Sequence, residues 1–262
     1  VYICRDHCGP GFNKKDDLID VYKTIFQDLE DGFDAIHIDF SRYSKGYEEG
    51  LKESIRAIEV INKVSPSTFI EVGTEDNTGL YFAGAERVQR EIKIFQSIGN
   101  LYFYTCQTGS LVQEDRQSGI FRQQYVKQIR EIVSKQKIYL KEHNADYLSD
   151  AGIKKRKDLV DAINIAPQLG VLQTRLTLAL ADKQGIATSD YMNKCYKSGF
   201  WKKWVTNTTS SPSRNLSILA GHYNFNTKEY KQLVQKIEKR IDFETILQNK
   251  IYSLLDRYVR NF

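Results

Sequence analysis

The sequence lacks the patterns that mark several specialised classes of protein. No apolar run approaches the roughly 18 residues of a membrane-spanning helix, and no signal-peptide pattern opens the chain. The four cysteines form no CxxC pair and have no repeating spacing, which argues against a disulfide framework and favours reduced thiols in a cytoplasmic protein. No basic run is interleaved with aromatic residues, so neither nucleic acid nor a membrane is expected as a partner.

The composition is that of an ordinary globular protein. The chain has 262 residues, 41% hydrophobic and 27% charged, enough for one large α/β domain or two small ones. The formal net charge is +5, but basic residues are mixed with acidic ones along helical stretches such as 127–141. Solvated helix faces account for this charge, and attraction of anionic sugar phosphates is the functional alternative.

Short apolar runs alternate with longer amphipathic stretches up to about residue 183. The runs are rich in Ile, Tyr, Phe and Val, as is typical of strands covered by helices. Gly32 and Pro66 are suited to ending the first two helices. The pattern predicts strands at 2–5, 35–40, 68–72, 101–106, 137–141 and 162–166. It predicts helices at 15–31, 48–64, 84–98, 118–134, 151–160 and 169–183, then a helical tail at 187–201, 227–239 and 243–260.

This alternation predicts an α/β protein with a parallel sheet. Six βα units are present, whereas a complete TIM-type (β/α)8 barrel needs eight. We therefore expect either a barrel whose first two βα units are missing from this chain or an open sheet. Because the chain begins inside a strand-like run, we expect it to be a piece of something longer. The predicted division is a barrel portion at 1–186 and a helical C-terminal extension at 187–262.

Charged and polar residues follow the ends of the predicted strands. Asp6 and His7 follow the first strand, His37 and Asp39 lie two apart on the second, and His143 follows the fifth. Because the carboxyl ends of parallel strands open onto one rim, we expect these side chains to surround a common pocket. The alternative is structural: a His–Asp hydrogen bond that ties down a loop, or a polar layer inside the sheet.

These residue types suit metal-assisted acid–base chemistry. His7, His143 and one carboxylate would satisfy a catalytic zinc site with an open position. A neighbouring carboxylate can transfer protons or orient a hydroxyl group, and the predicted catalytic residues are Asp6, Glu75 and Asp39. His222 lies in the helical tail and is expected to be a surface or packing residue. The predicted substrate-binding residues are Arg5, His37, Ser41, Glu71, Thr74, Gln107 and Asp146.

The same segments resemble a known family. Residues 4–10 (CRDHCGP) resemble the GGDHLGP segment of the accessory, non-catalytic subunit of class II tagatose-1,6-bisphosphate aldolase, and 32–39 (GFDAIHID) resemble its GFxKIHLDAS. Residues 72–75 (VGTE) match IGTE, 143–147 (HNADY) match HSTDY, and 165–169 (IAPQL) fall where the family has VGPAL. The matches follow the same order over nearly the whole chain. Phe40 replaces an alanine, while Arg5 and Cys8 replace small and aliphatic residues.

The resemblance implies a TIM barrel that acts in sugar-phosphate metabolism beside a catalytic aldolase subunit. One hypothesis is therefore a barrel that binds a phosphorylated sugar or supports a catalytic aldolase subunit, or forms a homo-oligomer. A second hypothesis is a stand-alone zinc-dependent aldolase, with Asp6 or Glu75 as acid/base. The resemblance supports it, because in class II aldolases themselves the Asp-His element supplies a proton-transferring aspartate and a zinc-binding histidine. A third is a structural partner whose polar rim residues only satisfy one another.

Overall fold

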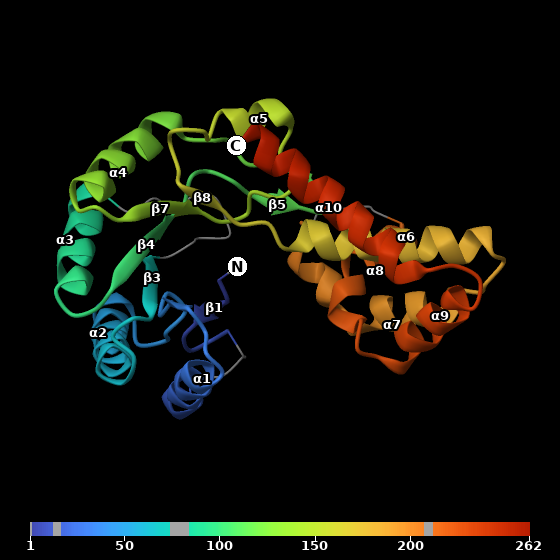
Figure 1. Cartoon of the computed structure of the whole chain (residues 1–262), viewed down its shortest axis with the longest axis horizontal. Coiled ribbons are helices and arrows are strands. Elements are labelled where there is room, and N and C mark those ends of the chain that lie inside the picture. The colour runs from blue at the N-terminus through green and yellow to red at the C-terminus, as the bar shows by residue number, and fades with distance from the viewer. Residues whose placement is uncertain (1, 13–16, 74–83, 207–211) are drawn as a thin grey trace. The chain divides into compact units, whose positions relative to one another are not determined.

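Six parallel strands form one curled sheet in the order β1-β2-β3-β4-β7-β8, so that the sheet makes half of a barrel wall (Figure 1). The computed structural model describes residues 2–12, 17–73, 84–206 and 212–262. Within them the sheet is open, with β1 and β8 as its edges. The strands are β1 (Cys4–Cys8), β2 (Ala35–Ile38), β3 (Phe69–Gly73), β4 (Leu101–Cys106), β7 (Tyr139–Glu142) and β8 (Ala162–Ile163), and a short hairpin is formed by β5 (Val112–Gln113) and β6 (Arg116–Gln117).

Ten α-helices accompany the strands in the part of the chain that the structure describes. They are α1 (Leu18–Glu30), α2 (Tyr47–Val64), α3 (Ala85–Gln96), α4 (Gln123–Lys135), α5 (Asp150–Lys154), α6 (Pro167–Lys183), α7 (Ser189–Ser198), α8 (Ser213–Leu219), α9 (Lys228–Glu238) and α10 (Phe243–Asn261), with 3-10 turns at Phe200–Lys203 and Gly221–Asn224. No described helix is long and apolar enough to cross a lipid bilayer.

The chain divides into two compact units. The first comprises Val1–Ser110, Ile120–His143 and Asp158–Ile163 and contains the sheet with α1 to α4. The second comprises Leu111–Gly119, Asn144–Lys157 and Asn164–Phe262 and is helical apart from the small hairpin. The predicted boundary between residues 186 and 187 stays a prediction.

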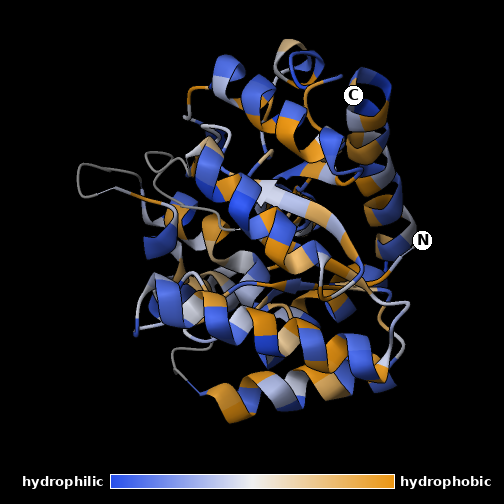
Figure 2. Cartoon of the chain, turned by 90° about the vertical axis from the view of Figure 1, so that its left-hand side faces the viewer, coloured by the Kyte–Doolittle hydropathy of each residue, from blue (hydrophilic) through white to orange (hydrophobic). Residues whose placement is uncertain are grey.

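Helices α1 to α4 lie on the convex side of the sheet in the first unit (Figure 1). Their buried residues recur at helical spacing, as in Val126, Ile129 and Val133 of α4. Figure 2 shows the same pattern as separate hydrophobic and hydrophilic sides along these helices. The facing strand residues, such as Ile36 and Leu140, are fully buried. This apolar layer leaves the other side of each strand free to carry polar residues.

The second unit has its own apolar core. Tyr191 and Cys195 of α7 pack with Ile237 of α9 and Ala181 of α6, all of them buried. The helical tail that the sequence predicts is therefore present. Helix α8 and the hairpin were not predicted. The helix has seven residues and each hairpin strand has two, which is too short to show a helical or strand-like spacing of apolar residues.

The predicted strands and helices are present with shifted ends. Gly32 has a left-handed backbone (φ 77°) directly after the end of α1, as its predicted role requires, and α2 ends at Val64, just before Ser65-Pro66. Helix α4 starts at Gln123 rather than at 118, and the backbone N–H of Arg122 just before it donates to the Thr108 carbonyl oxygen at 2.7 Å. Helix α5 ends at Lys154, well short of the predicted 160.

Candidate metal centre

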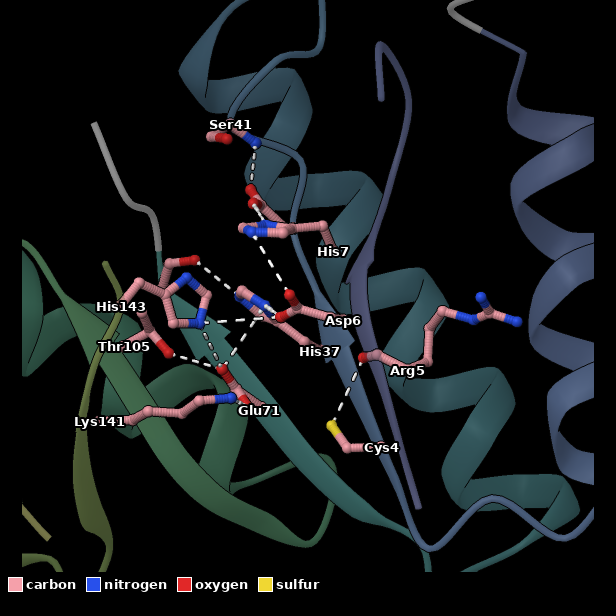
Figure 3. Close-up of polar contacts among 12 residues, drawn as sticks. Cys4, Arg5, Asp6, His7, His37, Ser41, Glu71, Thr105, Lys141 and His143 are labelled. Atoms are coloured by element: carbon pink, nitrogen blue, oxygen red, sulfur yellow. Dashed lines mark hydrogen bonds and ion pairs between the residues drawn. The ribbon is translucent and has the colours of Figure 1, made fainter. Parts of the chain in front are cut away.

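Four strands bring two carboxylates and two imidazoles together on the concave side of the sheet. Asp6 comes from β1, His37 from β2, Glu71 from β3, and His143 directly follows β7. The register pairs His37 with Glu71 on adjacent strands, so their side chains share a face. Figure 3 shows all four side chains turned toward one another. One ligand atom of each lies within 4.8 Å of the corresponding atoms of the other three.

The separations in this cluster are longer than those of ordinary hydrogen bonds, which are about 2.7–3.0 Å. His37 Nδ1 lies 3.5 Å from Glu71 Oε1 and 3.6 Å from Asp6 Oδ1, while His143 Nε2 lies 3.4 Å and 3.8 Å from the same two oxygens. His37 is fully buried, and its Nδ1 has no hydrogen-bond partner among the described residues. A buried polar atom without a partner is costly unless something else satisfies it.

The same separations suit ligands around one metal ion. Zinc bound at 2.0–2.1 Å in tetrahedral geometry keeps its ligand atoms about 3.3–3.4 Å apart. Two imidazole nitrogens and two carboxylate oxygens are also donors that zinc and related divalent metals accept. The donor set and the unsatisfied His37 nitrogen therefore fit a bound divalent cation.

A β-bulge places both Asp6 and His7 near the cluster. Adjacent residues of a regular strand point to opposite faces. Here the register with β2 shifts between Arg5 and Cys8, and His7 adopts a left-handed backbone with φ 49°. Such a bulge redirects a side chain, and its cost is typical of functional sites.

His7 forms a dyad with Asp39 instead of joining the four-residue cluster. Its Nδ1 lies 2.8 Å from Asp39 Oδ2, and Asp39 Oδ1 accepts the backbone N–H of Ser41 at 2.9 Å. The side chain of His7 is 29% exposed and that of Asp39 only 1%, so the imidazole retains access to a ligand. His7 Nε2 lies 3.9 Å from Asp6 Oδ2, which places the dyad beside the cluster. His7, His37 and Asp39 also form a second group with metal-ligand spacing.

Two residues that the sequence analysis missed hold Glu71. Lys141 Nζ lies 2.7 Å from Glu71 Oε2, and Thr105 Oγ1 donates to Glu71 Oε1 at 2.7 Å (Figure 3). Lys141 belongs to β7 and lies two residues before His143, which directly follows that strand, so the period-2 alternation could have identified it. Thr105 carries no comparable signal, because a threonine within a strand is ordinary.

Opposite charges within the cluster shift its pKa values. Burial alone would raise the pKa of Glu71, but His37, His143 and Lys141 outweigh it and lower that pKa. Burial likewise opposes ionisation of Asp6 and Asp39, yet nearby imidazoles lower the pKa of both carboxyl groups. Burial would lower the pKa of His37, but Glu71 and Asp6 raise it. The carboxylates are thus held ionised, the form in which they bind a cation.

A cavity of about 210 Å³ adjoins the site. It is lined by Arg5, Asp6, His7 and Phe12 and by residues around the start of α1 that include Asp20 and Thr24. The space is therefore beside the dyad and within reach of a small polar ligand.

The remaining predicted site residues are placed differently. The Arg5 guanidinium pairs with the buried Asp28, with Nε 2.6 Å from Asp28 Oδ2, and its side chain points away from the cluster (Figure 3). Gln107 Oε1 accepts the backbone N–H of Gly109 at 2.7 Å. In the second unit, Asp146 Oδ1 accepts the backbone N–H groups of Ala166 and Gln168 at the start of α6. Thr74 and Glu75 lie outside the described residues.

No family model matches this sequence, and no curated protein matches it. The family named from its motifs therefore stays a resemblance.

Solved structures share the fold. A probable tagatose 6-phosphate kinase from Sinorhizobium meliloti aligns over 99% of this chain and 75% of its own, with a TM-score of 0.74 and 13% identity. A fructuronate-tagaturonate epimerase from Cohnella laeviribosi aligns over 97% and 67%, with a TM-score of 0.61 and 10% identity. A fructose-bisphosphate aldolase from Campylobacter jejuni aligns over 91% and 69%, with a TM-score of 0.52 and 15% identity. At these identities the likeness concerns the fold alone.

Proposed function

We propose that this chain binds a divalent metal ion through Asp6, His37, Glu71 and His143 and acts on a phosphorylated sugar as an aldolase-type carbon–carbon lyase. The observation that carries the proposal is the spacing of four donor atoms from different strands, at 3.4–3.8 Å across the measured pairs. Hydrogen-bonded structural networks are closer, as the 2.7 Å contacts of Glu71 with Thr105 and Lys141 illustrate.

When bound, a metal ion of this kind polarises a carbonyl oxygen and stabilises the negative charge that develops beside it. Zinc is the ion that the resemblance implies. Thr105 would keep the Glu71 carboxylate oriented, as an outer-shell partner of a metal ligand does, while Lys141 neutralises the other carboxylate oxygen.

His7 is the proposed proton-transfer residue. With the proton of its imidazole on Nδ1 and directed at Asp39, Nε2 is free to accept a proton from a substrate hydroxyl. In aldol cleavage that hydroxyl becomes the new carbonyl: its proton moves to His7, the carbon–carbon bond breaks, and the bonding electron pair passes to the carbon next to the original carbonyl. Asp39 positions the imidazole and stabilises its protonated form, as a dyad carboxylate does.

This assignment exchanges two roles that the sequence analysis expected. Asp6 becomes a metal ligand rather than the acid/base, and His7 becomes the acid/base rather than a ligand. Glu75 lies outside the described residues, and its acid/base role stays a prediction.

The substrate class is supported by the likeness of fold. The three solved structures above have names that refer to a sugar phosphate, a sugar acid or a sugar bisphosphate. Fold-level analogy raises the expectation of an anionic sugar without assigning one. On the same grounds we propose that the curled sheet is part of a TIM-type barrel.

A second candidate is an accessory subunit that binds a phosphorylated sugar without turning it over. The order of family-like motifs along the chain favours it. In that role the Lys141–Glu71 and His7–Asp39 pairs would satisfy the polar groups without a metal, and a catalytic aldolase subunit or a second copy of this chain would be the partner.

Metal analysis tests the proposal. We expect the purified protein to hold about one equivalent of zinc or a related divalent metal. Glu71→Gln and His143→Ala should each lower the affinity for that metal by more than the roughly 10–100-fold that is typical of outer-shell changes. His222→Ala, which changes a histidine outside the cluster, serves as the control, and circular dichroism establishes that each variant folds. Metal binding that is absent, or unchanged in both ligand variants, would refute the metal centre.

Activity then separates the two candidates. Metal-loaded protein is mixed with tagatose 1,6-bisphosphate or fructose 1,6-bisphosphate, and triose phosphate formation is measured. We expect cleavage, and a loss of about 100-fold or more in His7→Asn with its metal content unchanged. Metal-replete protein that cleaves neither sugar alone, but raises the activity of an added catalytic aldolase subunit, would favour the accessory role.

A further inference from the structure

Arg42 lies near the His7–Asp39 dyad on an aromatic support. The Phe12 ring stacks on the His7 imidazole, with centroids 4.9 Å apart and planes 19° from parallel. The Arg42 guanidinium carbon lies 4.5 Å from the Phe12 ring centroid, a cation–π distance. These two separations limit the distance from the guanidinium carbon to the centre of the His7 ring to at most about 9.5 Å.

The two loops that carry this stack are packed tightly together. A Cβ built on Gly9 would lie 1.6 Å from the Asp39 carbonyl oxygen, and one on Gly11 would lie 2.9 Å from Arg42 Cβ. Gly11 also has a left-handed backbone, φ 78°, which disfavours other residues. The loop after β1 is therefore in close contact with the loop after β2, and the position of Arg42 is coupled to that of the dyad.

Arg42 forms no ion pair with any carboxylate of the described residues and is exposed. Arg5, the arginine expected to bind substrate, is engaged by Asp28. Among the described residues the Arg42 guanidinium is held by a ring and by no carboxylate, so no described acid occupies its N–H donors. A guanidinium presents a planar fork of N–H groups that matches phosphate and carboxylate oxygens.

We propose that Arg42, supported by Phe12, binds the anionic group of the substrate and makes the site selective for anionic sugars. This inference rests on the proposed function and adds its specificity residue. The cluster and the dyad together contain three acidic residues, Asp6, Asp39 and Glu71, so a cation near them offsets their repulsion of an anion. Phosphate and carboxylate share the required chemistry, and the test distinguishes them.

Binding of matched sugars tests this role. Calorimetric titrations use fructose, fructose 6-phosphate and galacturonate as probes, each with zinc-loaded and with chelator-treated protein. We expect fructose 6-phosphate to bind at least about tenfold more tightly than fructose, the factor that about 1.4 kcal/mol confers. Arg42→Gln should reduce that ratio to within twofold. If only the galacturonate preference depends on Arg42, the anionic group recognised is a carboxylate.

The matched control is Lys45→Gln, which removes an equally exposed cation three residues away that lies over Tyr43 and not Phe12. It changes the net charge by the same amount and should leave the ratio unchanged. Phe12→Leu keeps an apolar side chain but removes the ring, and we expect it to lower the ratio severalfold without a change of charge. Thermal unfolding of each variant establishes that it folds.

Equal ratios in Arg42→Gln and Lys45→Gln would overturn the inference, as would a wild-type protein that binds neutral and anionic sugars alike. Metal content measured on the same samples separates the two proposals. Metal-bound protein with Arg42-independent binding refutes only the specificity role. Arg42-dependent anion binding by protein that takes up no metal even when zinc is supplied refutes the metal centre and supports Arg42.

Discussion

Lys141 and Glu71 form an ion pair on the concave side of the sheet, with Nζ 2.7 Å from Oε2 and side chains that are 14% and 1% exposed. Glu71 belongs to the four-residue cluster, whereas Lys141 does not. The lysine therefore supplies positive charge where a bound metal ion would also supply it.

The first prediction concerns Lys141, whose ammonium group and a bound metal ion would both neutralise Glu71. Lys141→Met leaves a buried carboxylate without its ammonium, so we expect the free energy of unfolding of metal-free protein to fall by about 3 kcal/mol. With saturating zinc the loss should be clearly smaller, because an ammonium and a metal cation repel each other at this range. Urea unfolding with and without zinc measures both losses. Equal losses in the two conditions would contradict the prediction.

Thr105→Val is expected to lower the affinity of the site for metal. The substitution keeps the shape of the side chain but removes the hydroxyl that donates to Glu71 Oε1. Because outer-shell donors orient metal ligands, zinc affinity should fall about 10-fold or more. Competition with a fluorescent chelator measures it. An unchanged affinity would mean that Oε1 is not a ligand atom.

Arg5→Met should affect stability and not ligand binding. Arg5 compensates Asp28, whose side chain is 1% exposed, and loss of one partner of such a pair costs about 3 kcal/mol. Metal content and the preference for anionic sugars should match the wild type. Chemical unfolding and the sugar titrations test both statements, and a selective loss of sugar binding would restore Arg5 to its expected role in substrate binding.

Gly9→Ala tests the contact between the two loops at the dyad. The new Cβ would overlap the Asp39 carbonyl oxygen, so we expect a loss of about 2–3 kcal/mol or more from displaced backbone. Gly32→Ala is the matched control: its φ is 77°, but no atom lies within 4 Å of the added Cβ, and a loss of about 1 kcal/mol is expected. Similar losses for the two variants would show that the loops yield easily.

Protonation of His222 is expected to destabilise the second unit at acid pH. Burial, aided by the charge of Lys203, lowers the pKa of His222 to about 4 from 6.5, so the unfolded chain binds this proton more readily. Stability should therefore be unaffected above about pH 6.5 and should decrease as the pH falls toward 4. Allowing for partial solvent exposure, the loss is about 1–3 kcal/mol.

His222→Phe removes this proton site, together with a buried Nδ1 that has no hydrogen-bond partner among the described residues, while keeping a ring beside Tyr223. Its stability relative to wild type should rise as the pH is lowered from 7 to 4. Denaturant unfolding across that range measures the difference, and a difference independent of pH would contradict the assignment.

Much of the architecture could be predicted from local patterns. The six strands of the sheet and most helices follow from apolar spacing, and Gly32 and Pro66 marked helix ends, because these signals act over a few residues. The gathering of Asp6, His37, Glu71 and His143 also follows from the parallel order of the strands, whose ends share one edge.

Only the tertiary structure decided which imidazole faces which carboxylate. The bulge at His7 turns that ring toward Asp39, while the register of β2 and β3 brings His37 to Glu71. In the structure Arg5 pairs with Asp28, and Arg42 lies over Phe12. The sequence alone does not show which of these two arginines is available to bind a ligand. The amino-acid order determines which side of a strand a residue occupies, but strand register, bulges and loop packing determine the atoms it meets.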